Sequence, residues 1–136
     1  MQKIGKQTIK FDNPPTILEC ASIVGPKESK GPLSKYFDQT LDDEFWGEKT
    51  WEKAESKIIK ETVNSVIHKS GISSDKIDCC FAGDLLNQCI SSSFGLREIN
   101  LPFFRSIWCL FYFCWIYVFR FYMCRKFCWK CFMCYI

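Results

Sequence analysis

The clearest alternation of apolar and polar positions lies between residues 51 and 70, where apolar side chains recur at steps of three and four. This spacing predicts an amphipathic helix with one apolar stripe. Thr50 is placed to cap its first turn, and Gly71 to take the left-handed conformation after its last. The stripe consists of Trp51, Ala54, Ile58, Ile59, Val63, Val66 and Ile67. We interpret the stripe as packing against a sheet.

Three shorter apolar runs predict strands on either side of this helix. Thr16–Val24, between two proline-containing turns, predicts a buried strand, and Ile77–Ala82 and Leu101–Phe104 predict two more. Leu85–Gly95 predicts a short helix, and residues 25–49 are predicted as loop. The order strand, helix, strand, helix, strand is typical of an α/β sheet with crossover helices. Three strands do not close a core, so we expect the opening part of a larger domain.

Composition divides the chain at Arg105. All 15 acidic residues of the sequence precede it, and residues 1–104 carry a net charge of −2. Residues 105–136 carry a net charge of +5, with 13 aromatic residues and 6 cysteines. One core does not use such different halves. We therefore expect a domain opening over residues 1–104 and a hydrophobic tail without a domain of its own over residues 105–136.

Several functional classes are not favoured by residues 1–104. The acidic balance and the lack of a basic cluster argue against nucleic-acid binding. Met1–Lys10 is polar and does not resemble a secretory signal, so we expect a cytoplasmic protein with reduced thiols. Cys20, Cys79, Cys80 and Cys89 are then interpreted as small buried apolar residues. His68, the one histidine, is interpreted as solvated, so we expect no metal site, no cofactor and no catalytic set.

A polar group follows the second predicted strand and supplies the candidate ligand-binding residues. They are Asp84, Asn87 and Gln88. Ligands of open α/β sheets bind outside the carboxyl ends of the strands. In the alternative interpretation, Asp84 caps the next helix and the two amides lie on the surface or at a subunit interface.

Four groups of residues, in order and spacing over residues 4–104, resemble a known family. They are Gly25–Glu28 with Gly31–Leu33 and Tyr36–Asp38, then Trp46–Glu55, then Gly83–Gln88, then Ser91–Arg97. On these residues the chain is similar to the stage V sporulation protein AD family of spore-forming bacteria. The resemblance implies a thiolase-like αβαβα fold built from two related halves, of which this chain holds an incomplete N-terminal part.

The resemblance also implies a function in sporulation. Family members are expected to be non-catalytic soluble subunits that bind dipicolinic acid and take part in its uptake into the forespore. The implied partners are dipicolinic acid and other subunits of a membrane channel complex, and the implied state is a homodimer peripheral to the forespore or spore inner membrane. An alternative is a fragment of a thiolase-like condensing acyltransferase, whose nucleophilic cysteine would lie in a Tyr-Gly-Ala-Cys-Ser-Thr-like run after Phe104.

That run is absent, and Arg105–Tyr112 stands in its place. Cys109 and Cys114 lack the small neighbours of the family cysteine. Permitted codons for Arg105–Tyr112 (AGA TCT ATA TGG TGC TTG TTC TAC) spell Asp-Leu-Tyr-Gly-Ala-Cys-Ser when read one base later. We therefore hypothesise a frameshift near codon 105 that leaves a truncated, non-functional protein.

Two other interpretations of the tail remain open. In the first, the chain is a small membrane-surface protein and the aromatic and basic tail is an interfacial anchor. In the second, Cys124, Cys128, Cys131 and Cys134 bind a metal ion.

Overall fold

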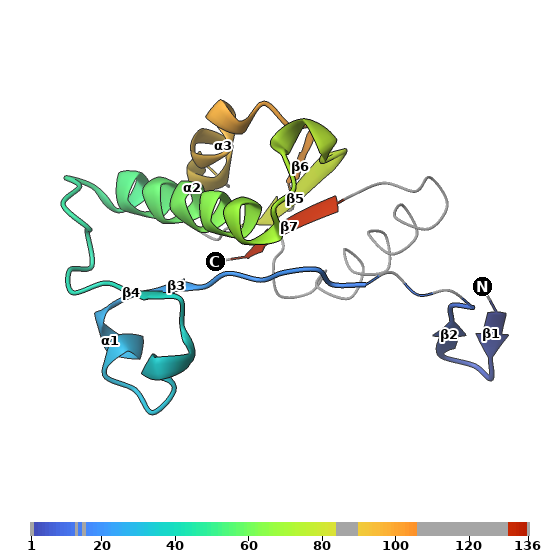
Figure 1. The fold of residues 1–136 in the computed structure, drawn as a ribbon. Helices are drawn as coiled ribbons and strands as arrows, with labels where there is room; N and C mark the ends of the chain where they lie inside the picture. Colours follow the sequence, from blue (N-terminus) through green and yellow to red (C-terminus); the bar gives the residue numbers. More distant parts are fainter. Residues whose placement is uncertain (1, 13, 15, 84–89, 106–130, 136) are drawn as a thin grey trace.

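The computed structural model describes residues 2–12, 14, 16–83, 90–105 and 131–135 of the 136-residue chain. These residues form one long helix, several short helical turns and three small sheets (Figure 1). In chain order the elements are β1 (Gln2–Ile4), β2 (Thr8–Lys10), β3 (Ile23–Val24), α1 (Pro26–Ser29), η1 (Ser34–Tyr36), β4 (Gln39–Thr40), α2 (Trp51–Ser70), η2 (Ser74–Lys76), β5 (Cys79–Gly83), α3 (Ile90–Gly95), η4 (Arg97–Ile99), β6 (Phe103–Arg105) and β7 (Cys131–Tyr135).

Helix α2 is confirmed with its predicted caps. The side chain of Thr50 accepts a hydrogen bond from the Lys53 amide at 3.4 Å, which satisfies one of the free N–H groups of the first turn. Gly71 has a φ of 63°, the left-handed conformation that glycine adopts without a Cβ clash. The stripe is buried at Ala54, Ile59, Val63 and Val66.

The first residue of the predicted stripe is not part of the core. Trp51 is 50% exposed and packs against Phe45, with ring centroids 4.3 Å apart. It lies in the first turn of α2, where the loop before the helix folds back over it. The interpretation of Trp51 as a core residue is therefore wrong, although the helical spacing that included it is correct.

The largest sheet is parallel and has the order β6-β5-β7. Strand β5 lies in its middle and is buried at every residue. Strands β5 and β6 follow each other along the chain with α3 between them, which confirms the predicted crossover and an α/β class built from helices and small parallel sheets. Residues 84–89 of the predicted helix Leu85–Gly95 lie outside the described residues, and its last part, Ile90–Gly95, is helical.

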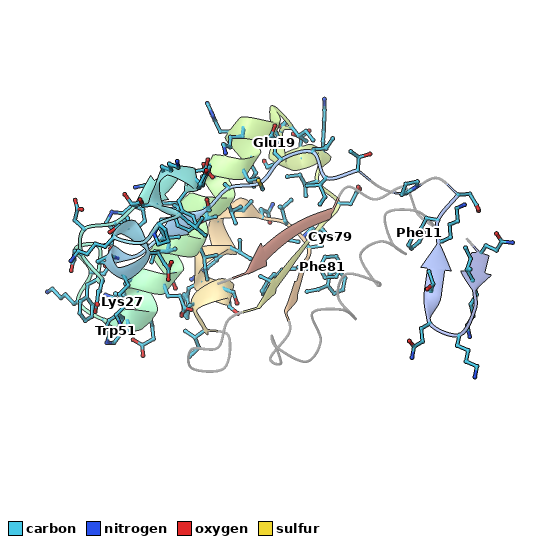
Figure 2. All side chains as sticks on the ribbon, turned by 90° about the horizontal axis from the view of Figure 1, so that it is seen from below. Phe11, Glu19, Lys27, Trp51, Cys79 and Phe81 are labelled. Carbon is cyan, nitrogen blue, oxygen red and sulfur yellow. The ribbon has the colours of Figure 1, made fainter. Side chains whose placement is uncertain are left out.

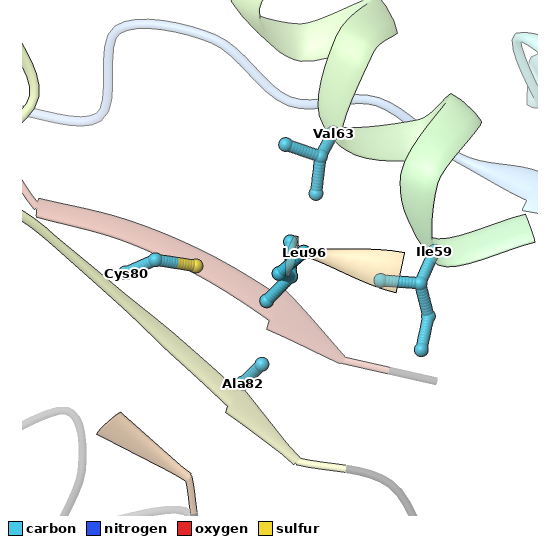
Figure 3. Close-up of a cluster of buried hydrophobic side chains, with 5 residues drawn as sticks. All are labelled: Ile59, Val63, Cys80, Ala82 and Leu96. Atoms are coloured by element: carbon cyan, nitrogen blue, oxygen red, sulfur yellow. The ribbon is translucent and has the colours of Figure 1, made fainter. Parts of the chain in front are cut away.

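The core lies between α2 and this sheet (Figure 3). Ile59 and Val63 reach it from α2, one helical turn apart, and Leu96 reaches it from the end of α3. Cys80 and Ala82 reach it from β5, because residues two apart on a strand face the same side. The interpretation of Cys79 and Cys80 as buried apolar residues is confirmed, and Cys89 lies outside the described residues.

The predicted strand Thr16–Val24 is mostly wrong. Only Ile23 and Val24 form a strand, β3, which pairs in parallel with β4. Ile17 and Leu18 are 66% and 65% exposed, and Cys20, predicted to be buried, is exposed. The physical reason lies at Ser22, whose amide donates to the carboxylate of Asp38 at 2.8 Å. That bond to a side chain holds the segment beside the end of α2.

The region predicted as loop, residues 25–49, also contains short elements. Pro26 begins α1, where the missing N–H of proline costs no helical hydrogen bond. η1 and β4 follow it. Strand β7 lies within the segment 105–136. Whether that segment forms a domain stays a prediction.

Candidate functional site

The predicted ligand-binding residues Asp84, Asn87 and Gln88 lie outside the described residues. The structure does describe what precedes and follows them. Gly83 ends β5, and α3 begins at Ile90. β6 is parallel to β5, with Ala82 in register with Arg105, so the carboxyl ends of the two strands share one edge. The candidate site at this edge therefore stays a prediction, now with Arg105 as a neighbour in register.

Small residues hold α3 close to α2 beside this edge. The Ser56 hydroxyl donates to the Ser91 carbonyl at 3.0 Å. A Cβ added at Gly95 would lie 2.7 Å from the Ser56 carbonyl oxygen, a distance that real Cβ atoms do not reach. Gly95 is thus required by the approach of the two helices. The apolar stripe did not predict this contact, because the residues that make the contact are small or polar and do not belong to the stripe.

Ser91 is the buried polar group nearest in sequence to the predicted site. The residue is fully buried, and among the residues that the structure describes its hydroxyl has no hydrogen-bond partner. A buried hydroxyl without a partner loses the hydrogen bonds that it makes to water. Ser91 was not predicted as a site residue, because Ser91, Ser92 and Ser93 contributed only to the family resemblance.

A second polar cluster joins three segments at the end of α2. Asp38 accepts hydrogen bonds from the Ser22 amide at 2.8 Å and the Ser22 hydroxyl at 3.3 Å. Lys69 of α2 forms an ion pair with Asp38 and donates to the Cys20 carbonyl at 3.0 Å. We call Ser22, Asp38 and Lys69 the clasp.

The charges of the clasp shift its titration. The hydrogen bond from Lys69, with the Ser22 amide second, holds the pKa of the Asp38 carboxyl below its ordinary value. The same bond raises the pKa of Lys69. The Ser22 hydroxyl donates to Asp38 and accepts from the Asp38 amide at 3.2 Å, so it is held between two groups of one residue. This arrangement ties the segment at Ser22 to the segment at Asp38. His68, which directly precedes Lys69 in α2, is exposed, as predicted.

A third cluster closes the loop before α2. The Asp43 carboxylate accepts from the Gly47 amide at 3.0 Å, and this bond holds its pKa below the ordinary value. Lys57 of α2 donates to the Trp46 carbonyl at 2.9 Å and lies 4.9 Å from the centre of the Trp46 ring. Glu48 adds an ion pair to Lys57 at 3.6 Å. Asp43 is thus part of a structured turn before α2.

The described part of the chain contains neither a cluster of metal ligands nor a helix that could span a membrane. Residues 2–83, 90–105 and 131–135, apart from 13 and 15, contain no group of three potential metal ligands. No helix among the described residues is long and apolar enough to span a bilayer. Cys124 and Cys128 lie outside the described residues, so the alternative of a cysteine metal site in the tail is untested.

Comparison with known proteins gives a consistent family. The family model described as Stage V sporulation protein AD matches residues 5–115. The sequence is 38% identical over 103 residues to Stage V sporulation protein AD of Bacillus subtilis (strain 168). That match covers 76% of this chain and 30% of the relative. The chain thus spans about a third of the relative's length, and the family match includes α2, β5, α3 and β6 but ends before β7.

Proposed function

The chain belongs to the stage V sporulation protein AD family and is a sporulation protein, and on that premise we propose that its family function is to bind dipicolinic acid during uptake into the forespore. The family match over residues 5–115 carries this proposal. In it, the protein is a non-catalytic soluble subunit that works with the other subunits of a membrane channel complex. The intact form is a homodimer with a thiolase-like fold, located in the cytoplasm at the forespore or spore inner membrane.

The chemistry of the ligand is consistent with the candidate edge of the sheet. Dipicolinic acid is a dianion at neutral pH, so its site needs hydrogen-bond donors or cations. Asn87 and Gln88 carry donor amides, and in the sequence they follow β5, whose carboxyl end shares an edge with that of β6. In this proposal the two amides contribute to binding the carboxylates.

A binding experiment tests the assignment of this edge. Titration calorimetry with dipicolinic acid is carried out on the full chain and on Asn87→Ala and Gln88→Ala variants, with benzene-1,3-dicarboxylate as a ligand that lacks the ring nitrogen. We expect weak saturable binding that each substitution lowers about tenfold, the loss of one charge-assisted hydrogen bond. Lys30→Ala, in an exposed loop, is the matched control. If both amide variants retain full affinity, the ligand binds elsewhere on the chain. If the full chain does not bind dipicolinic acid at all, the proposal is wrong for this chain.

We also propose that residues 105–136 arise from a shifted frame and that the chain is therefore a truncated form without the full function. The change in composition at Arg105 supports this. DNA sequencing of the gene decides it. We expect the neighbouring frame after codon 104 to spell Asp-Leu-Tyr-Gly-Ala-Cys-Ser. Any other sequence in that frame refutes the frameshift.

A further inference from the structure

Strand β7 occupies an edge of β5 that belongs to the family-matched part of the chain. β5 and β6 lie within the match over residues 5–115, and β7 lies beyond it. β7 pairs with β5 over all five of its residues, from Cys79 with Cys131 to Gly83 with Tyr135. Parallel strands such as β5 are stable when both edges and both faces are covered. A different occupant is therefore needed whenever β7 is not in place.

The sequence contains a segment with the properties of that occupant. Thr16–Val24 has the apolar pattern of a buried strand, yet its residues 16–22 form no strand in the structure. Ile17 and Leu18 remain about two-thirds exposed, which leaves large apolar surface in water. Figure 2 shows Glu19 on this segment, beside α2, and Cys79 and Phe81 at the sheet.

Chain topology directs this segment to the same edge. A strand followed by a helix and a parallel strand forms a right-handed unit in which the two strands are neighbours. Residues 16–22 precede α2 and β5 in the chain, with the short elements β3, α1, η1 and β4 between them and α2, and α2 already packs on the face of β5. Since β6 holds one edge of β5, the position left for residues 16–22 is the one that β7 holds.

We propose that β7 and residues 16–22 are alternative occupants of one edge of β5, so that pairing of the tail strand displaces the N-terminal segment from the sheet. The clasp holds the displaced segment, because Lys69 donates to the Cys20 carbonyl and Asp38 accepts from the Ser22 amide. The exchange is within one chain and breaks no covalent bond.

Amide hydrogen exchange on the full chain tests the proposal. The variant Phe132→Pro/Met133→Pro removes two successive N–H groups of β7, one of which faces β5 because successive residues of a strand point their N–H groups to opposite sides. We expect the amides of residues 17–21 to exchange rapidly in the parent and to gain about tenfold or greater protection in the variant, with α2 still helical. Residues 17–21 that stay unprotected beside a helical α2 overturn the proposal.

A second pair of substitutions separates exchange from general damage. Ile17→Asp/Leu18→Asp changes only exposed side chains of the parent, so we expect unchanged protection of β5. Combined with the proline pair, it is expected to remove the protection of β5 that the proline pair alone retains. A proline variant that unfolds outright overturns the proposal, since the segment then fails to replace β7. Protection that appears only with dimer formation on size exclusion also overturns it, in favour of pairing between two copies.

Discussion

The ammonium group of Lys69 lies 2.5 Å from a carboxylate oxygen of Asp38 and 3.0 Å from the Cys20 carbonyl. The last turn of α2 thereby holds the segments at Cys20 and Asp38, both of which lie well before α2 in the sequence. Lysine is well placed there, because its charge also compensates the negative end of the helix dipole. The contact holds the segment before β3 at the end of the helix.

The clasp should depend on pH in both directions. The pKa of Asp38 is lowered by folding, so its contribution is present above the unfolded value of about 4 and is lost as the pH falls through the folded pKa. The pKa of Lys69 is raised, so its contribution is present below about pH 10.4 and is lost as the pH rises through the folded pKa. The Ser22 amide shift in NMR spectra should report the acid step.

The variants Asp38→Asn and Lys69→Gln check this assignment. Asp38→Asn should abolish the acid step at the Ser22 amide, and Lys69→Gln should move it upward toward the ordinary pKa of aspartate. Because the pair is partly exposed, added salt should have the same effect in weaker form. If Lys69→Gln does not change the pH at which the acid step occurs, the ion pair does not lower the pKa of Asp38.

Gly95→Ala should destabilise the chain by about 1–3 kcal/mol. The new methyl group would meet the Ser56 carbonyl and Ile59, both of which are fixed in α2. Gly25→Ala is the matched control, because nothing lies within 4 Å of its added Cβ and its φ is negative. Urea denaturation followed by circular dichroism at 222 nm measures both. Equal stability of the two variants would mean that α3 does not approach α2 this closely.

Ile59→Ala should cost about 2–5 kcal/mol, since it leaves a cavity at the centre of the core. Ile59 is fully buried between α2 and β5, whereas its neighbour Ile58 is only partly buried. Ile58→Ala should therefore cost clearly less, although it removes the same atoms. The comparison uses thermal unfolding of both variants. Similar losses would contradict the helix orientation shown in Figure 3.

Phe104→Ala should lower stability by about 1 kcal/mol through loss of an aromatic pair. The rings of Phe81 and Phe104 stack with centroids 5.3 Å apart, on register partners of β5 and β6. Phe94→Ala removes a ring that is 61% exposed and should stay within about 0.5 kcal/mol of the parent. Equal effects in chemical denaturation would show that the β5–β6 register does not bring the two rings together.

Local patterns were sufficient for the elements whose signals lie within the element itself. The spacing of Ile59 and Val63, the cap at Thr50 and the glycine at position 71 specify α2 without reference to the rest of the chain. The apolar run Ile77–Ala82 likewise predicted the strand that the structure shows as β5. These features depend on backbone geometry and a single apolar face, and both can be inferred from sequence.

Features that depend on a distant partner could not be predicted in this way. The apolar character of Ile17 and Leu18 indicates a strand, but it does not say whether an edge is free for it. The aspartate at position 38 looks like a solvated acid until the fold brings Ser22 to it. The candidate residues Asp84, Asn87 and Gln88 stay a prediction, because their support comes from sequence position and family resemblance.

The described cysteines with placed side chains differ in access to water. Cys20 is exposed, while Cys79 and Cys80 lie in the middle strand with almost no exposed surface. An alkylating reagent should therefore modify Cys20 within the first moments and reach the other two only when the sheet opens. Peptide mapping at successive times would measure the rate at which each cysteine is alkylated. The modification rate of Cys79 and Cys80, compared with that of Cys20, thus reports how often the central sheet opens.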